Sequence, residues 1–240
     1  MVTERGTNIN TNQEIEIIFE DNHLLVVRKP VNMLTQRDRT GDVDILTLLK
    51  EDLKKRYNKR GNVYLGLVHR LDRPVGGVMV FAKTSKAASR ISEQIRTRQF
   101  KKDYLAVVHG VLDRVEGSLE NYLIKDTKNN RVSTTKSSIP GAKLALLKYI
   151  VLGVYKDLSL IKIQLQTGRP HQIRVQLSEI GHPLYGDQKY GYSINKPGQQ
   201  IALWSNKITM IHPVLKNEVS FKCTPPEKPP WVRFAAVLLQ

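Results

Sequence analysis

Segments with the pattern of β-strands outnumber segments with the pattern of helices in this chain, and the two kinds do not alternate. The expected strands are short apolar or alternating runs at residues 14–19, 24–29, 63–68, 78–83, 101–111, 144–155 and 159–166, and within 201–223. Apolar residues at helical spacing indicate helices at 45–53, 84–98 and 170–180. Parallel strands need long crossover connections, usually helical. The pattern therefore predicts an α+β domain around a mixed, largely antiparallel sheet.

The stretch from Val68 to Gly77 places one carboxylate, Asp72, on a Pro/Gly turn between two apolar strands. Arg70 and Arg73 flank it, and nearby cations keep an acid ionised at neutral pH. Rigid scaffolds present catalytic groups on such strand-flanked loops. An aspartate that only forms a turn has the same appearance beside Pro and Gly, so this stretch alone leaves both roles open for Asp72.

The charge of the chain favours a polyanionic partner. It has 38 Lys and Arg residues against 22 Asp and Glu, a formal net charge of +16. Such an excess indicates nucleic acid first and an anionic membrane second, and no apolar run approaches the roughly 20 residues of a membrane span. Residues 1–12 are polar, lack the apolar core of a signal peptide and are expected to form a disordered tail.

A single cysteine, Cys223, limits the chemistry further. It excludes an intramolecular disulfide and favours a reducing cytoplasm. The cysteine set of the zinc deaminases is absent, and no cluster of His and carboxylates has metal-ligand spacing. We therefore expect a cytoplasmic protein that needs no metal.

A second group of polar residues, Thr167 to Arg174, lies at the start of the expected helix 170–180. Pro170 suits a first helical turn, and free N–H groups with the helix dipole would make an anion site there. His171 and Arg174 are three residues apart and share a face. This helix end suits either a phosphate or a catalytic carboxylate, and a solvated basic face is the alternative.

Three other segments bear on function. Tyr104 lies among cations in Phe100–Leu105, where its ring could stack on a nucleobase or be an ordinary buried strand tyrosine. Residues 124–143 are long, polar and without a helix pattern, which is typical of a functional or disordered tract. Gly181–Gly191 is dense in Gly, Pro and aromatic residues and is expected to be a structural loop.

These pieces, in this order, resemble the RluA-type family of RNA pseudouridine synthases. The family pattern runs H-R-L-D before a Gly-containing turn, K-x-Y on a strand, T-G-R-x-H-Q-I-R, and then G-H-P-(x)2-G-D-(x)2-Y-G. The chain carries these motifs as His69–Asp72, Lys102–Tyr104, Thr167–Arg174 and Gly181–Gly191, and it matches an early K-P element and a late H-P element at Lys29-Pro30 and His212-Pro213. The match covers about residues 14 to 226.

The resemblance implies roles for individual residues. Asp72 is the implied catalytic aspartate, and Arg174 is its implied salt-bridge partner. Tyr104 is the implied ring that packs on the target uracil and assists proton removal from C5. The residues implied in substrate binding are His69, Arg70, Arg169 and His171, of which Arg70 contacts RNA near the extruded nucleotide.

The resemblance also implies a fold and a reaction. Residues 13–240 would form one catalytic domain, a mixed sheet in two subdomains with a central active-site cleft. It would convert uridine to pseudouridine in RNA without a cofactor, with ribosomal RNA favoured over transfer RNA and a monomer favoured. Residues before Glu14 are too few for the S4 domain of many relatives, so we expect RNA capture through the catalytic domain and its basic segment Lys125–Lys143.

Two departures from the family pattern lie in turns. Val75 and Gly76 stand where Thr-Ser is usual, which predicts extra backbone freedom after Asp72. Asn32 stands where Gly is usual, and Asn tolerates a left-handed backbone, so that turn is expected to be kept. Two rival functions remain. A nucleoside or glycoside hydrolase would need a second carboxylate, and a non-catalytic RNA-binding protein would explain the charge alone.

Overall fold

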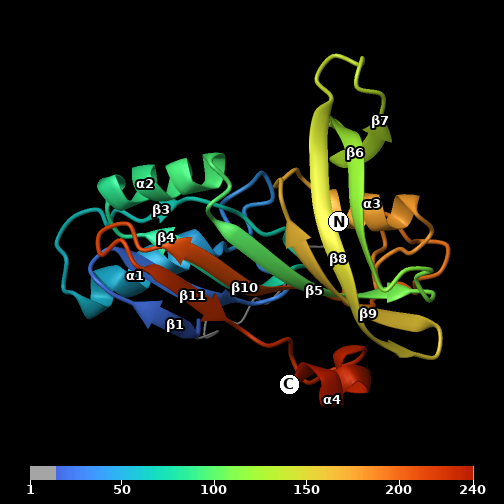
Figure 1. The fold of residues 1–240 in the computed structure, drawn as a ribbon. Helices are drawn as coiled ribbons and strands as arrows, with labels where there is room; N and C mark the ends of the chain where they lie inside the picture. Colours follow the sequence, from blue (N-terminus) through green and yellow to red (C-terminus); the bar gives the residue numbers. More distant parts are fainter. Residues whose placement is uncertain (1–14, 240) are drawn as a thin grey trace, which may run out of the picture.

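The computed structural model describes residues 15–239, so the tail expected at 1–12 lies outside the described residues. The strands join in one eleven-stranded sheet with the order β1-β2-β4-β10-β5-β9-β8-β6-β7, where β11 also pairs with β10 and β3 with β4 (Figure 1). The strands are β1 (Ile17–Glu20), β2 (Leu24–Lys29), β3 (Gly66–Leu67), β4 (Gly76–Ala82), β5 (Lys101–His109), β6 (Glu116–Asp126), β7 (Arg131–Thr135), β8 (Lys143–Tyr155), β9 (Leu158–Leu165), β10 (Leu203–Ile211) and β11 (Glu218–Lys222).

The pairing of these strands is antiparallel except between β10 and β4, which run parallel over a short register. The prediction of an α+β domain with a mixed, largely antiparallel sheet is therefore confirmed. The helical elements are α1 (Ile45–Arg56), α2 (Ser85–Arg96), α3 (Gln172–Glu179), a 3₁₀ turn (Trp231–Phe234) and α4 (Ala235–Leu238). Among the described residues, no helix is long and apolar enough to cross a membrane.

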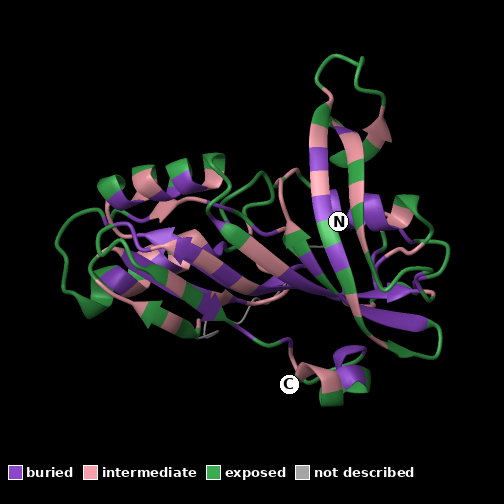
Figure 2. Cartoon of the chain, in the orientation of Figure 1, coloured by how far each residue is buried: buried purple, intermediate pink, exposed green. Residues whose placement is uncertain are grey.

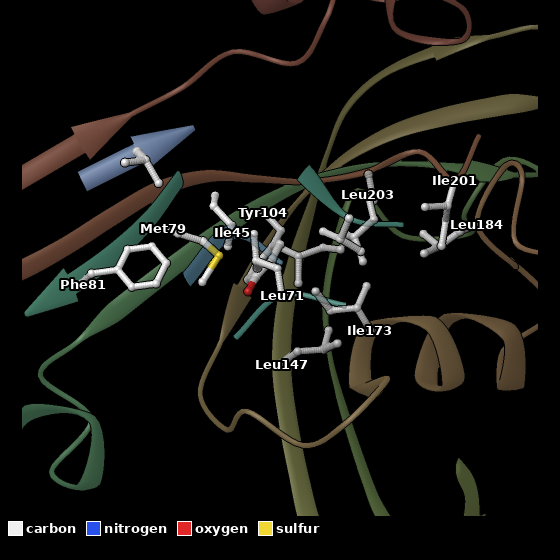
Figure 3. Packing of buried hydrophobic residues seen from close by; sticks show 14 of the residues in the cluster. Ile45, Leu71, Met79, Phe81, Tyr104, Leu147, Ile173, Leu184, Ile201 and Leu203 are labelled. Carbon is white, nitrogen blue, oxygen red and sulfur yellow. The ribbon is translucent and has the colours of Figure 1, made fainter. Parts of the chain in front are cut away.

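Both faces of the sheet are covered, because side chains alternate between faces along each strand. Buried residues of α1 and α3 pack with one set from β4 and β5, including Met79 and Tyr104. Buried residues of α2 and the C-terminal turn pack with the alternate set, including Val80 and Leu105. Figure 2 shows the resulting purple interior, and Figure 3 shows Tyr104 within the first cluster. Asp72 follows Leu71, which belongs to that first cluster.

Two expected helices have the limits that their capping residues predict. Thr84 caps α2, because its side chain accepts a hydrogen bond from the Ala87 N–H at 3.1 Å. Gly181 follows α3 with a φ of 81° and so ends the helix as expected. The predicted start of α3 is wrong. Pro170 is not in its first turn, because His171 has a left-handed φ of 51° and helical geometry begins at Gln172.

Of the two alternatives left open for residues 124–143, functional or disordered, the structure argues against disorder. Residues 124–143 include the end of β6, all of β7 and the start of β8, so most of this polar tract is ordered as a hairpin. The buried apolar residues of the β6–β7 hairpin, Leu123 and Val132, meet Ala145 of β8 and Val175 of α3 in a small cluster. After Pro230 the chain continues into helical turns, which Trp231 and Phe234 anchor in the core.

Candidate active site

The loop around Asp72 is fixed through its backbone. The Thr35 hydroxyl donates to the Leu71 carbonyl at 2.8 Å, on the N-terminal side of the acid. On the C-terminal side, the Val75 N–H donates to the Asp72 carbonyl at 2.9 Å and closes the turn. The Asp72 side chain itself remains 32% exposed. The fold thus holds the backbone of this residue and leaves its carboxylate accessible.

Lys29 lies directly beneath this loop, and the sequence alone did not assign it a role. Its side chain is fully buried, and Nζ donates to the carbonyls of Pro30, Arg73 and Val75 at 2.9, 3.2 and 2.8 Å. Burial lowers the pKa of Lys29 to about 7, against the opposing effect of the Asp72 charge. Lys29 therefore ties the C-terminal side of the Asp72 turn to the end of β2.

Replacing Lys29 with Met is expected to lower the free energy of unfolding by about 2–3 kcal/mol, because carbonyls left buried lose their donor. Urea denaturation followed by circular dichroism measures this. Lys86→Met, at an exposed position of α2, is the control with the same change in charge. A Lys29→Met protein as stable as this control would show that the three hydrogen bonds contribute nothing.

Gly76 and Gly77, which begin β4, are required by close contacts with β10. A Cβ at Gly76 would lie 2.4 Å from the Trp204 ring. Gly77 has a φ of 117°, and a Cβ there would lie 2.2 Å from the Ser205 carbonyl oxygen. The departure at Gly76 thus accommodates Trp204, and the expected extra freedom is wrong because β10 pairs with both glycines. Asn32 has a φ of 62° and keeps its turn as predicted.

Gly76→Ser, which restores the usual family residue, is expected to destabilise this protein by about 1–3 kcal/mol, the range for overpacking a filled core. The new Cβ must displace the Trp204 ring. Gly61→Ser is the control, since a Cβ at Gly61 meets nothing within 4 Å. Thermal and urea unfolding give the comparison, and equal stability of the two variants would contradict the proposed contact.

Arg174, on α3, brings a buried guanidinium to Asp72. Its Nε and one terminal nitrogen donate to Oδ2 and Oδ1 of Asp187 at 2.7 and 2.8 Å. The other terminal nitrogen lies 3.4 Å from Asp72 Oδ2. The two contacts with Asp187 fix the plane of the guanidinium, and its remaining nitrogen faces Asp72. Arg174 thus connects the Asp72 loop to the loop that follows α3.

Asp187 is the functional candidate that the sequence reasoning missed, since its loop was expected to be only structural. Its side chain is fully buried. Asn195 holds the surrounding backbone by donating to the carbonyls of Leu184, Asp187 and Gly191. The available signal was the G-D pair in the matched motif, but spacing alone did not identify Arg174 as its partner.

His171 approaches the same Asp72 oxygen as Arg174. Its Nε2 is 3.8 Å from Asp72 Oδ2, and its Nδ1 is 2.7 Å from the Tyr190 hydroxyl oxygen. That hydroxyl also accepts the Val132 N–H at 2.9 Å, so donating its own proton to Nδ1 satisfies all three groups. Burial lowers the pKa of His171, although the Asp72 charge opposes this. We infer a neutral ring with its proton on Nε2, toward Asp72.

Tyr104 comes from the centre of β5 and is 6% exposed. Its ring packs in the cluster that contains Leu71 and Ile173 (Figure 3). Burial raises the pKa of the Tyr104 phenol, and the charge of Asp72 raises it further, so the hydroxyl keeps its proton. Of the two alternatives for this tyrosine, burial in a strand describes its environment, and stacking on a nucleobase stays a prediction.

The other predicted site residues do not all face Asp72. Arg70 is exposed, and among the described residues it forms no side-chain hydrogen bond or ion pair. Arg169 is half-buried, and its Nε donates to the Leu144 carbonyl at 2.9 Å. His69 is buried, accepts the Val80 N–H at 3.0 Å and packs against Phe100. Burial lowers the pKa of His69 to about 3. These contacts suit a neutral residue that holds the chain before the Asp72 loop against β4.

Comparisons with known proteins agree with this geometry. A family model described as RNA pseudouridylate synthase matches residues 23–179, more than half of the chain. The uncharacterized RNA pseudouridine synthase YhcT of Bacillus subtilis is 33% identical over 204 residues, which cover 84% of this chain and 65% of that protein. Ribosomal large subunit pseudouridine synthase D of Zymomonas mobilis is 33% identical over 224 residues, 89% of this chain and 70% of that protein.

Solved structures share the fold. Human RNA pseudouridylate synthase domain containing 4 superposes with a TM-score of 0.76 at 24% identity, covering 93% of each chain. Human RNA pseudouridylate synthase domain containing 1 gives 0.71 at 23% identity, covering 91% of this chain and 86% of that one. The chain spans about two thirds of the length of YhcT and similar curated relatives. The family model, the relatives and the ordered motifs agree: the chain belongs to the RNA pseudouridylate synthase family.

Proposed function

We propose that this protein is an isomerase that converts uridine to pseudouridine in RNA, with Asp72 as the catalytic residue. The observation that carries the proposal is an accessible carboxylate held against the buried guanidinium of Arg174 and close to the buried phenol of Tyr104. The excess of positive charge suits an RNA substrate. Relatives named ribosomal large subunit pseudouridine synthases support ribosomal RNA as the substrate, and transfer RNA is the alternative.

The reaction breaks the N1–C1′ bond of uridine, turns the uracil and joins C5 to C1′. C5 loses its proton and N1 gains one, so the change is an isomerisation that needs no electron acceptor. An ionised Asp72 either attacks C1′ or removes the C2′ proton, and both routes require its negative charge. Arg174 places a buried positive charge 3.4 Å from that carboxylate.

Tyr104 has a defined place in this scheme. A flipped uracil needs a flat surface on which to pack, and the ring of Tyr104 supplies it from the centre of the sheet. Its phenol is protonated in the free protein, partly because Asp72 is negative nearby. If Asp72 attacks C1′, that negative charge is lost in the ester, and one of the two causes that raise the Tyr104 pKa disappears. Removal of the C5 proton through Tyr104 then becomes easier.

The hairpin of β6 and β7 offers a basic surface for RNA close to His171 and Tyr190. Its Arg131 side chain lies 5.5 Å from the centre of the Tyr190 ring. Lys189 Nζ donates to the Asn130 carbonyl at 2.8 Å, which joins the hairpin to the Asp187 loop. The charges of Lys189 and Lys125 both contribute to the lowered pKa of His171. These cations support the expected RNA capture through the Lys125–Lys143 segment.

The geometry disfavours a hydrolase that uses two carboxylates. Asp187 is the acid joined to Asp72 through Arg174, but it is fully buried, and each of its oxygens accepts a hydrogen bond from that guanidinium. It therefore has no free oxygen with which to activate water or protonate a leaving group. A non-catalytic RNA-binding protein would not need a carboxylate in a basic surface, since that charge repels phosphate.

The test is conversion of uridine by the purified protein. Ribosomal and transfer RNA transcripts that lack pseudouridine are incubated with the protein, and pseudouridine is located by a chemistry that stops reverse transcription at the modified base. We expect conversion at a limited number of sites in ribosomal RNA. Conversion only in transfer RNA would change the substrate class, and RNA that is bound but never converted would overturn the proposed activity.

A further inference from the structure

Lys102 lies on β5 two residues before Tyr104 and therefore on the same face of the sheet. Its strand neighbours are Leu165 on β9 and Ile208 on β10. Its side chain is half-buried, and Nζ lies 3.0 Å from the position that a Cβ on Gly168 would occupy. The ammonium thus lies against the Thr167–Arg169 turn, on the same side of the sheet as the proposed base platform.

The charge of Lys102 has no counter-ion within the described part of the chain, where its side chain forms neither an ion pair nor a hydrogen bond. Its neighbours on β5 differ. Lys101 lies 3.9 Å from Glu218, and Asp103 lies 3.3 Å from Lys162. Burial lowers the pKa of Lys102, and no carboxylate opposes that shift. Burying an unpaired charge costs stability. No contact within the described residues offsets that cost for the Lys102 ammonium.

The two segments that Lys102 approaches each contain an arginine. Arg169 follows Gly168 directly in the chain, and the Lys102 charge is close enough to contribute to the lowered pKa of His69, the residue before Arg70. Lys102 therefore lies against a turn whose next residue is Arg169, and near the segment that contains Arg70. Such a place suits a small, strongly negative group with several oxygen acceptors, which lysine binds as a point charge.

We propose that Lys102 binds a phosphate of the RNA backbone beside the target nucleotide, one side-chain repeat along β5 from Tyr104. This inference rests on the proposed function for its ligand. The repeat measures roughly 6.6 Å along the strand, a separation on the scale of one nucleotide. The phosphate supplies the counter-charge that the protein lacks, and the contact fixes how far the target nucleotide enters the site.

The test measures RNA affinity against salt for Lys102→Met and for the matched control Lys101→Met. Both variants lose one charge from adjacent residues, but Lys101 is exposed on the opposite face and pairs with Glu218. Each phosphate contact adds about 0.7–0.9 to the slope of log affinity against log salt. We expect the slope for Lys102→Met to be smaller than the wild-type slope by about that amount. If the two proteins bind equally at 1 M salt, the variant should bind RNA about sixfold more weakly than wild type at 0.1 M salt. Lys101→Met should keep the wild-type slope.

A second measurement uses the wild-type protein, in case Lys102→Met folds poorly. Lysines are acylated with and without bound RNA, and the modified peptides are identified by mass spectrometry. RNA should protect Lys102 several-fold and leave Lys101 unprotected. Equal reactivity of Lys102 in both states, or equal salt slopes for the two variants, would overturn the inference. Wild-type protein that binds RNA with the expected slope but makes no pseudouridine would overturn the proposed activity alone.

Discussion

Asp72→Asn is expected to reduce pseudouridine formation by at least about 10⁴-fold, the scale seen when a residue that reacts directly is removed. The amide has nearly the shape of the carboxylate, but it neither attacks C1′ nor accepts the C2′ proton. RNA affinity should hold or rise slightly, because a negative charge near the phosphates is lost. The assay follows release of tritium from C5 of labelled uridine in the RNA, with affinity measured separately.

Asp113→Asn controls for the change in net charge, since Asp113 is exposed in the turn between β5 and β6. It should convert uridine at the wild-type rate. If Asp72→Asn retained more than a small fraction of that rate, the chemistry would have to be assigned to another residue. Loss of both activity and RNA binding in Asp72→Asn would point to a damaged fold and would be visible in its unfolding curve.

Asp187→Asn is expected to cost about 3–5 kcal/mol of unfolding free energy, because it leaves the buried Arg174 charge without its main partner. Conversion should fall as well, since the guanidinium loses the two hydrogen bonds that fix its plane beside Asp72. Glu93→Gln is the matched control. It breaks an exposed arginine–carboxylate pair with Arg96, and such pairs contribute about 0–1 kcal/mol. A similar loss in both variants would contradict the burial argument.

The direction of the Asp187 pKa shift predicts how its contribution to stability changes with pH. Burial alone would raise the pKa of Asp187, but the hydrogen bonds and charge of Arg174 outweigh it and lower the pKa below 3.8. The stabilisation is therefore present above the unfolded value and is lost as the pH falls through the lower, folded value. The stability difference between wild type and Asp187→Asn should be constant near neutral pH and shrink below pH 3.8. A difference that grows on acidification would contradict this assignment.

The strand pattern predicted the class of fold because most strands carry enough apolar residues to be recognised from the sequence. Val78–Ala82 is buried throughout, and Ile161–Leu165 alternates between buried or half-buried apolar residues and exposed polar residues. The β6–β7 hairpin escaped prediction because its only buried apolar residues are Leu123 and Val132, and its order comes from pairing with β8 and contact with α3. Local sequence does not contain that tertiary contribution.

The start of α3 shows a different limit. Proline at a first helical turn is a sound statistical signal, yet the chain places His171 in a left-handed conformation after Pro170. That conformation accompanies the contacts of the His171 ring with Tyr190 and Asp72. Tertiary contacts at the site therefore override the local preference.

The sequence identified candidate site residues where the motif itself contained the proposed reacting group. It did not identify residues whose role depends on contacts with parts of the chain far away in sequence. Asp72, Tyr104 and Arg174 lie in three separate motifs, and the fold brings all three together. Lys29 and Asp187 also lie in matched motifs, but their roles follow from which atoms they reach. The carbonyls of Arg73 and Val75 are 44 and 46 residues from Lys29 in sequence, and spacing does not show such contacts.

The burial of Tyr104 has a consequence for how the proposed activity could be altered. One side chain serves as part of the hydrophobic core and as the surface under the proposed substrate base. A smaller residue there would open a cavity in the core as well as remove the platform, so the two losses cannot be separated. Changes in substrate preference must therefore come from exposed or half-buried positions such as Arg70 and Arg169. Selection for a new RNA target would act on residues at the periphery of the site, while Tyr104 stays constant.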